Sequence, residues 1–557
     1  MKFDSFLKIS TLLIAGSMLS GCGTSGGNNP ADLFNGAVFI SDREGVNELY
    51  IADSEATTVS KISPEGLVGS VKSFSVSPNI GFITYLADQD IPDVNELYYL
   101  KKTIGGTAGI EAPVKVNSDL VAGQNVTQYE WSPNGLFIAY ISDEGGVFEL
   151  YVSDARSTIK VSPTVAAGDV VDFKWSPDSK HIAFTASVKC TACATGVAVE
   201  LHVSTHNLNT VNDPVLATQI SRSLTGAAPV DYEWSPSVLS SSNYIAYMSD
   251  QDTAIVDLYT IAVGKLTDTA TALANTIKVT DATTGSVQAF RWPNLNDTAL
   301  AYTAALPGGG INLFATKPGV ADVLVLSAVP SGGVTADFLW APNNSLLAYV
   351  ADQDSPGVFE LYTTTTVLDG TDTVAKVSTT MAGTGIDVTD GFIWGLFSNQ
   401  LIYRADQEIA GVFELFTSTT DGVDTTQGQR ISGDLTGGSI GTDFQLSPFG
   451  NTVSYIADQD GTGKFELYGT GLTDNNSVAK LSFGIDANVD VLLHDWSADG
   501  TKVFYLADQD ADEVFDVYTT VVSGLGNLNL SNSPVAADVT DGALIDGRGV
   551  TENLVSP

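Results

Sequence analysis

The chain has 557 residues, 43% of them apolar, and its 65 acidic residues against 25 basic ones give a net charge of −40. This charge repels phosphate and so excludes nucleic acid as an evident partner, whereas it favours cations and basic protein surfaces. Four histidines and three cysteines leave few side chains for nucleophilic or transition-metal chemistry.

The first 21 residues are typical of an export signal. Two lysines accompany an apolar run, ISTLLIAGSML, that is too short to span a bilayer as a mature helix. The run ends in Leu-Ser-Gly-Cys22, which resembles the signal of bacterial lipoproteins; an ordinary cleaved signal peptide is the alternative. The resemblance implies lipidation of Cys22, and Gly23, which is not Asp, implies sorting to the outer membrane. We expect residues 22–36 to form the lipidated Cys and a flexible tether.

Two signatures then alternate through residues 37–557. One is an aromatic residue, any residue, Trp, and then Ser-Pro or a similar pair; all seven tryptophans of the protein occupy it. The other is an apolar run, an Asp-rich turn and a second apolar run, as in TVSYIADQDGTGKFELY (Thr452–Tyr468), which is typical of a β-hairpin. An aromatic residue in the first hairpin strand marks ten repeats, 44 (Tyr140 to Phe184) to 63 (Phe184 to Tyr247) residues apart. These aromatics are Phe39, Tyr85, Tyr140, Phe184, Tyr247, Tyr302, Tyr349, Tyr403, Tyr455 and Tyr505.

Each repeat predicts four short strands, of which the Trp strand is the first and a segment such as AKVS (Ala375–Ser378) is the last. Four-stranded units at this period are typical of a β-propeller, and we expect each Trp to wedge between neighbouring sheets. The first repeat lacks its first strand, and DVTDGALID (Asp538–Asp546) echoes the first strand DVTDGFIWG (Asp387–Gly395). We therefore predict an all-β propeller of about ten blades, closed by a C-terminal strand that completes the first blade. Two smaller propellers in tandem are the alternative.

The two signatures together resemble the TolB-type propeller repeats. WSPDSKHIAF (Trp175–Phe184) and ISDREGVNELY (Ile40–Tyr50) are close to that family's repeat, and the resemblance covers roughly residues 37 to 518. Such blades occur in periplasmic scaffolds and in the propeller halves of peptidases. The resemblance implies that the blades act as binding surfaces, and it carries over no catalytic residue.

Carboxylates recur in the hairpin turns as Asp-Gln-Asp, and the propeller reading gathers them on one rim of the ring. In one interpretation the first Asp of each turn accepts hydrogen bonds from turn amides and the rest are solvated. In a second, the turns bind calcium, the one cofactor that the chain suggests. In a third, the rim docks a basic partner. We expect the Glu of each Glu-Leu-Tyr to face outward. The calcium interpretation involves Asp88, Asp90, Asp250, Asp252, Asp352, Asp354, Asp406, Asp458, Asp460, Glu466, Asp508 and Asp510.

Other candidate sites are weaker. Cys190 and Cys193 predict a local disulfide in an exported protein; a zinc site with His202 and His206 is the alternative. The stretch 437–441 matches the hydrolase elbow pattern but lies in a Gly-rich connection, so no triad is predicted. Four carboxylates just precede the first strands, where we expect them to initiate strands rather than to ring a funnel. They are Asp172, Asp231, Asp337 and Asp443.

These observations predict a non-catalytic protein-binding or scaffold module of the bacterial cell envelope. It would be anchored to the outer membrane through lipid and would bind envelope proteins through its acidic rim. The alternatives are a calcium-binding surface or structural lipoprotein, and an envelope enzyme with its site in the central funnel.

Overall fold

The computed structural model describes residues 36–522 with several internal gaps. The gaps are 42–44, 54–58, 79–81, 102–110, 164–167, 190–196, 206–216, 222–230, 237–242, 253–254, 267, 281–283, 321–323, 328–332, 380–387, 398, 436–437, 460, 474–477, 483–489, 498–499 and 512–513. Cys22, Cys190, Cys193, Asp460 and the closing strand at 538–546 therefore lie outside the described residues, as do the side chains of Asp508 and Asp510.

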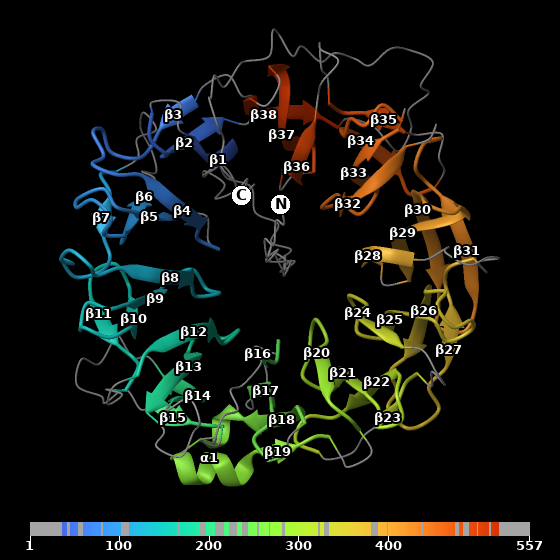
Figure 1. The fold of residues 1–557 in the computed structure, drawn as a ribbon, viewed down its shortest axis with the longest axis horizontal. Coiled ribbons are helices and arrows are strands. Elements are labelled where there is room, and N and C mark those ends of the chain that lie inside the picture. The colour runs from blue at the N-terminus through green and yellow to red at the C-terminus, as the bar shows by residue number, and fades with distance from the viewer. Residues whose placement is uncertain are drawn as a thin grey trace, which may run out of the picture.

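Ten β-sheets follow one another along the chain and stand as blades around one central axis (Figure 1). Eight blades have four described strands, and the first and the last have three. The prediction of an all-β propeller of about ten blades is confirmed. The alternative of two smaller rings is wrong, because the weak repeats around Phe184 and Tyr302 form four-stranded blades of the same ring.

The strands occupy equivalent positions in successive blades. The first strands, nearest the axis, are β4 (Val71–Val76), β8 (Val126–Trp131), β12 (Val170–Trp175), β16 (Asp231–Trp234), β20 (Val287–Arg291), β24 (Val334–Trp340), β28 (Val388–Trp394), β32 (Ser439–Leu446) and β36 (Val491–Trp496). The second strands are β1 (Gly36–Ser41), β5 (Phe82–Ala87), β9 (Ile138–Ser142), β13 (His181–Lys189), β17 (Tyr244–Ser249), β21 (Leu300–Ala305), β25 (Leu346–Ala351), β29 (Gln400–Ile409), β33 (Thr452–Asp458) and β37 (Lys502–Ala511).

The third strands are β2 (Glu48–Asp53), β6 (Glu96–Lys101), β10 (Glu149–Ser153), β14 (Val197–Thr205), β18 (Asp257–Ala262), β22 (Ile311–Thr316), β26 (Glu360–Thr365), β30 (Val412–Thr420), β34 (Glu466–Gly471) and β38 (Val514–Val521). The outer, fourth strands are β3 (Val59–Lys61), β7 (Val114–Lys115), β11 (Thr158–Lys160), β15 (Ala217–Gln219), β19 (Ile277–Lys278), β23 (Leu324–Val325), β27 (Val374–Lys376), β31 (Thr425–Arg430) and β35 (Ala479–Lys480).

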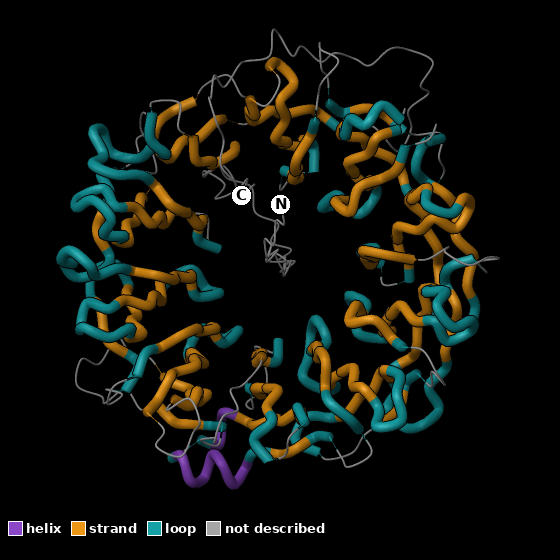
Figure 2. The backbone as a smooth tube through the Cα atoms, in the orientation of Figure 1, coloured by secondary structure: helices purple, strands orange, loops and turns teal. Residues whose placement is uncertain are grey.

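Helical structure is minor among the described residues. The helix α1 (Thr269–Asn275) follows the short 3-10 turn η2 (Val263–Lys265) and lies on the outer edge of blade 5 (Figure 2). Asp268 begins α1 by accepting a hydrogen bond from the Thr271 amide at 2.9 Å. No helix in the described part of the chain is long and apolar enough to cross a membrane.

An aromatic pair defines the core of every blade. The aromatic residue of the second strand stacks on its register partner in the third strand, as Tyr349 stacks on Tyr362 with ring centroids 5.7 Å apart. All ten marker residues make this stack, with His202 as the partner of Phe184. Each such pair adds about 0.5–1.5 kcal/mol beyond its area burial, so the stack is a repeated source of stability.

The tryptophans join neighbouring blades. The buried indole of Trp394 donates from Nε1 to the carbonyl oxygen of Leu339 in the preceding blade at 3.0 Å. The indoles of Trp175, Trp234, Trp292 and Trp340 do the same one blade apart. The predicted wedge between sheets is therefore confirmed, and the indole N–H adds a hydrogen bond to it.

Candidate functional site: the acidic rim

The turns between second and third strands lie on the same face of the ring as the connections between blades, because strands alternate in direction within each sheet. We call this face the rim. The turns between first and second strands and between third and fourth strands lie on the opposite face. The Asp-Gln-Asp segments are all rim turns, so the predicted gathering of carboxylates on one face follows from the observed topology.

The first Asp is buried and serves the backbone in four rim turns, at Asp88, Asp352, Asp406 and Asp458. Asp250 differs, because it is half-buried and its Oδ1 accepts no hydrogen bond from the described residues. Asp352 is 6% exposed, and its carboxylate accepts hydrogen bonds from the amides of Gly333 at 2.7 Å and Gly357 at 2.9 Å. Asp458 likewise accepts from Thr462 and Gly463 at 3.0 and 2.9 Å. Asp88 and Asp406 make the same kind of contact. These bonds fix the turn and the start of the first strand, as the amide interpretation expects.

The Gln of the turn binds the core rather than solvent. Tyr349 donates its hydroxyl hydrogen to Gln353 Oε1 at 3.1 Å, and Tyr85 donates to Gln89 Oε1 at 2.8 Å. In blade 9 the Gln459 amide nitrogen donates to the Tyr455 hydroxyl at 2.8 Å. In these three blades the Gln therefore ties the rim turn to the stacked aromatic pair.

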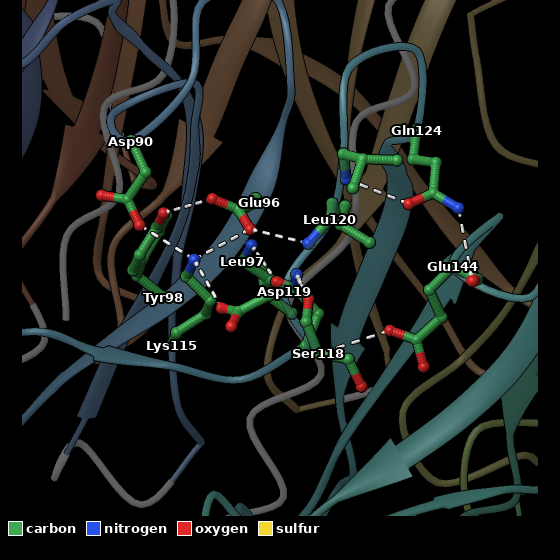
Figure 3. A network of polar contacts seen from close by, with 12 residues as sticks. Asp90, Glu96, Leu97, Tyr98, Lys115, Ser118, Asp119, Leu120, Gln124 and Glu144 are labelled. Atoms are coloured by element: carbon green, nitrogen blue, oxygen red, sulfur yellow. Dashed lines mark hydrogen bonds and ion pairs between the residues drawn. The ribbon is translucent and has the colours of Figure 1, made fainter.

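The second Asp faces a cation from the fourth strand. Blade 2 shows the arrangement (Figure 3), in which Lys115 Nζ lies 2.9 Å from Asp90 Oδ2 and 2.9 Å from Glu96 Oε1. The same ammonium group is 3.3 Å from Asp119, whose side chain is 97% exposed. Blade 7 repeats the pattern, with Lys376 Nζ 2.9 Å from Asp354 and 2.6 Å from Glu360.

The Glu of Glu-Leu-Tyr, or of Glu-Leu-Phe in blade 8, is buried in five blades and half-buried at Glu466, so the expectation that it faces outward is wrong. Glu96 is fully buried and accepts a hydrogen bond from the Tyr98 hydroxyl at 2.9 Å, besides its contact with Lys115. A buried carboxylate needs such a cation and donor, because desolvation alone would make it costly. The alternation of the strand does place this Glu on the face of Tyr98, two residues on.

The acid–cation pair recurs in seven blades. Its cation always stands at the register partner of the third-strand aromatic, as Lys376 pairs with Tyr362. Two other blades with a described fourth strand lack the pair: blade 6 has Asn312, Phe314 and Val325 at the three positions, and blade 4 has Glu200, His202 and Gln219. The pairs are Glu48–Lys61, Glu96–Lys115, Glu149–Lys160, Asp257–Lys278, Glu360–Lys376, Glu414–Arg430 and Glu466–Lys480.

The pKa values follow from these contacts. The hydrogen bond from Lys115 is the largest effect on Asp90 and holds the pKa of that carboxyl below its ordinary value. Burial by itself would lower the pKa of Lys115, but its bonds to Asp90 and Glu96 outweigh burial and raise it. Burial and the neighbouring Glu96 raise the pKa of Tyr98, so this hydroxyl stays protonated and remains a donor.

The cations do not neutralise the rim. In blade 7 Lys376 contacts Asp354 and Glu360, and Asp352 adds a third carboxylate to the same turn, which leaves two negative charges. In blade 8 Arg430 likewise contacts Glu408, Glu414 and Asp434, and the Asp434 side chain is 86% exposed. The rim therefore presents surplus negative charge in a fixed arrangement.

Sequence reasoning missed the cations, although the sequence contains their signal. Lys or Arg stands two residues before a Ser, Thr or Asn that follows the fourth strand, as in Lys376 and Ser378. That Ser accepts the amide of the Leu in Glu-Leu-Tyr, at 3.1 Å from Leu361 to Ser378. A Lys repeated at one strand position of an acidic protein indicates a partner carboxylate inside the same sheet.

The carboxylates that precede the first strands differ from one another. Asp172 accepts from Gln128 at 3.1 Å and from the Tyr232 hydroxyl at 2.9 Å, so it links three inner strands. Asp231 lies 3.4 Å from Lys174 Nζ. This convergence of polar groups on β8, β12 and β16 exceeds the strand-initiating role that we expected of these residues.

Glu130 lies on the same inner wall. Glu130 is exposed at the surface, yet it stands among the packed inner strands, and burial and then the charge of Asp172 raise its pKa to about 7. Lys174 opposes this shift. The carboxyl of Glu130 therefore keeps its proton to a higher pH than an ordinary glutamate does.

A buried histidine occupies the last inner strand. His494 Nε2 lies 2.8 Å from Ser454 Oγ, and its Nδ1 lies 3.0 Å from Asp443 Oδ2, an ion pair when the imidazole is protonated. The distances resemble those of a Ser-His-Asp triad, but Ser454 is fully buried. The Ser439 of the elbow-like stretch instead contacts the Phe413 amide.

The remaining predictions concern metals. Asp252 accepts the Tyr259 hydroxyl, and Glu466 accepts the Tyr468 hydroxyl and contacts Lys480. In the part of the chain that the structure describes, no group of three or more His, Cys, Asp or Glu side chains is placed to hold a metal ion. Calcium binding at the turns stays a prediction, as does the disulfide of Cys190 and Cys193.

No protein-family model matches the chain, and no curated protein sequence matches it. Among solved structures, one described as "Crystal structure of the eukaryotic initiation factor" aligns with a TM-score of 0.45 and 11% identity, over 80% of this chain and 96% of that chain. The β-propeller fold stands on the ten sheets of the ring itself.

Proposed function

We propose that the protein is a non-catalytic protein-binding or scaffold module of the bacterial cell envelope, a TolB-like β-propeller anchored to the outer membrane through Cys22. The observation that carries the proposal is the carboxylate surplus on one rim. Three carboxylates against one cation in blades 7 and 8 give a fixed negative surface that attracts and orients basic protein partners.

The topology supports this orientation of the ring. Gly36 pairs with Asp53 and Ser41 pairs with Glu48, so the chain begins β1 on the face opposite the rim. A tether that leads from a lipidated Cys22 to Gly36 would hold that opposite face toward the membrane. The acidic rim would then point away from the lipid, where envelope proteins could approach it.

The experiment is site-specific photocrosslinking in intact cells. A photoreactive amino acid replaces Asp119 or Asp434, which are the exposed rim acids of blades 2 and 8. The control positions are Asp369 and Asp421, exposed acids in third-to-fourth-strand turns on the opposite face. We expect crosslinks to a basic envelope protein from the rim positions alone, whereas crosslinks from neither rim position, or from all four positions alike, contradict the proposal.

The anchor is tested separately. The Cys22→Ser variant should leave the membrane fraction while the parent chain stays in it and incorporates labelled palmitate. A variant that stays in the membrane fraction unlabelled would contradict anchoring through this Cys.

A further inference from the structure

A cavity of about 460 Å3 opens at the rim between blades 9 and 10. Its walls come from β32, from the rim turn of blade 9 and from residues 490–492, where β36 begins. Two carboxylates, Asp443 and Asp490, line it together with the aromatic ring of Phe465 and the apolar side chains of Ile456 and Leu492. This volume is in the range of sites that bind small molecules or single side chains.

The repeat departs from its pattern at this interface. His494 occupies the first-strand position that is aromatic in every other described first strand. The aromatic residues there are Phe74, Tyr129, Phe173, Tyr232, Phe290, Phe338, Phe392 and Phe444. Between blades 4 and 5 the equivalent contact joins Asp172 to the Tyr232 hydroxyl at 2.9 Å, whereas here His494 Nδ1 lies 3.0 Å from Asp443 Oδ2.

The histidine positions Asp443 in the cavity wall. The His494 ring is held from its other side by Ser454 at 2.8 Å, and its main-chain oxygen accepts the Gln445 amide at 2.6 Å. His494 is 3% exposed, and 39% of the Asp443 side chain is exposed. The buried imidazole, bonded to Ser454, thus lies directly behind a carboxylate that remains open to the cavity.

The second carboxylate is fixed by the backbone. Asp490 Oδ1 accepts the Phe465 amide at 2.9 Å, which holds the Asp490 carboxylate next to the aromatic residue. Carboxylates beside an aromatic ring and apolar walls suit an alkyl guanidinium or ammonium group, which gains charge pairing and cation–π attraction and covers its methylenes. The apolar walls offer a hydrated metal ion few of the oxygen ligands that it needs.

We propose that this cavity binds the guanidinium or ammonium group of a Lys or Arg side chain presented by a basic partner of the rim. The inference rests on the proposed function and adds the site of anchorage to it. Asp443 and Asp490 supply the charge, Phe465 supplies the aromatic face, and His494 is a positioning residue for Asp443.

The test is isothermal titration calorimetry of the full chain with a blocked Gly-Arg-Gly peptide. Asp443→Asn and Asp490→Asn should each weaken binding of the peptide at least tenfold, because each removes one charge and keeps the shape. The matched control is Asp169→Asn, since Asp169 Oδ1 accepts the Phe148 amide at 3.0 Å between blades 3 and 4, where Gln128 stands in the place of Asp443. The control should bind like the parent.

Two further arms separate the alternatives. Agmatine, a free guanidinium compound, should bind more weakly than the peptide; equal binding would overturn the assignment to a protein side chain in favour of a small organic cation. His494→Phe, which restores the residue type of the other blades, should weaken peptide binding while thermal unfolding stays unchanged. The inference is overturned if the Asp169→Asn control loses peptide binding, or if the Asp443→Asn variant binds the peptide as tightly as the parent does.

The two proposals fail in different ways. If the peptide does not bind but the rim positions crosslink a basic protein, this cavity is not the anchorage and the docking function stands. If the peptide binds as expected but crosslinks arise only from the opposite face, the cavity stands and the docking function fails.

Discussion

The Lys376→Val substitution tests whether the rim network stabilises the fold. It removes the cation that lies 2.6 Å from Glu360 and 2.9 Å from Asp354. Glu360 is 2% exposed and accepts the Tyr362 hydroxyl at 2.9 Å. A carboxylate is then left charged inside the blade without its counterion.

The expected loss of unfolding free energy follows from the burial of this ion pair. Breaking a buried ion pair by removing one partner costs about 3–5 kcal/mol. The Lys376 side chain is 19% exposed, so water reaches part of the site and we expect the low end, about 3 kcal/mol in the free energy of unfolding. The double substitution Lys376→Val and Glu360→Asn reproduces the residue types of blade 6, where Asn312 and Val325 stand. It should recover all but about 1 kcal/mol, since no charge remains buried.

The assay is equilibrium unfolding in urea, followed by circular dichroism and by tryptophan fluorescence. Both probes are needed, because a large ring need not unfold in one step. The control is Lys180→Val, whose side chain is 75% exposed, and it should stay within about 0.5 kcal/mol of the parent. The reasoning is refuted if Lys376→Val behaves like this control, or if the double variant is no more stable than the single one.

Four other predictions concern the rim, the blade contacts and the channel. Asp352→Ala leaves the Gly333 and Gly357 amides without their acceptor, so it should cost about 2–4 kcal/mol in urea unfolding, and a cost equal to that of Asp354→Ala would contradict a special role for the first Asp. Trp394→Leu removes the bond to Leu339 and part of the wedge, so it should cost about 2–4 kcal/mol, whereas Phe397→Leu at a 76% exposed position should cost little. The pKa of Glu130 is raised from 4.5 to about 7 in the folded chain, so this carboxyl loses its proton at a lower pH in the unfolded chain than in the folded one. Glu130 therefore lowers the free energy of unfolding as the pH rises between these values. Glu130→Gln should therefore melt at a higher temperature than the parent at pH 8 and at the same temperature at pH 4; the opposite order at pH 8 would show that the sign is wrong. Calcium and a chelator should give the same melting temperature, because lysines and amides already bind the turn carboxylates, and a calcium-specific rise would instead support the metal interpretation.

The fold was predictable because the same two sequence signatures recur at similar intervals along the chain. The Trp of the first strand and the aromatic residue of the hairpin recur in successive repeats although the loops between them differ in length. Both make core contacts in the structure, as the wedge of Trp394 and the stack of Tyr349 on Tyr362 show. The face of the Asp turns followed from strand order alone. Alternation along a single strand, however, does not say which side of a sheet is buried when neighbouring sheets cover both.

That ambiguity explains the error at Glu96. A charged residue in a strand of mostly apolar residues is expected to be exposed, and only the pairing of β6 with β7 brings Lys115 to Glu96 and makes its burial tolerable. The contacts of His494 could not be predicted from the sequence either. They join blades 9 and 10 through Ser454 and Asp443, which lie 40 and 51 positions before His494 in the chain. Contacts between blades depend on the ring closing, which no single repeat encodes.

The central claim is that one face of the ring attracts basic partners, and the most direct measurement is the association rate of the full chain with an immobilised Lys-rich peptide at low and high salt. The rim reversal Asp119→Lys with Asp434→Lys should slow association about tenfold and weaken its salt dependence, because it alters the field at the approach path. The equally charged reversal Asp369→Lys with Asp421→Lys, on the opposite face, should leave the rate near that of the parent. Equal slowing by the two reversals would show that net charge alone attracts the peptide, and would contradict a docking rim.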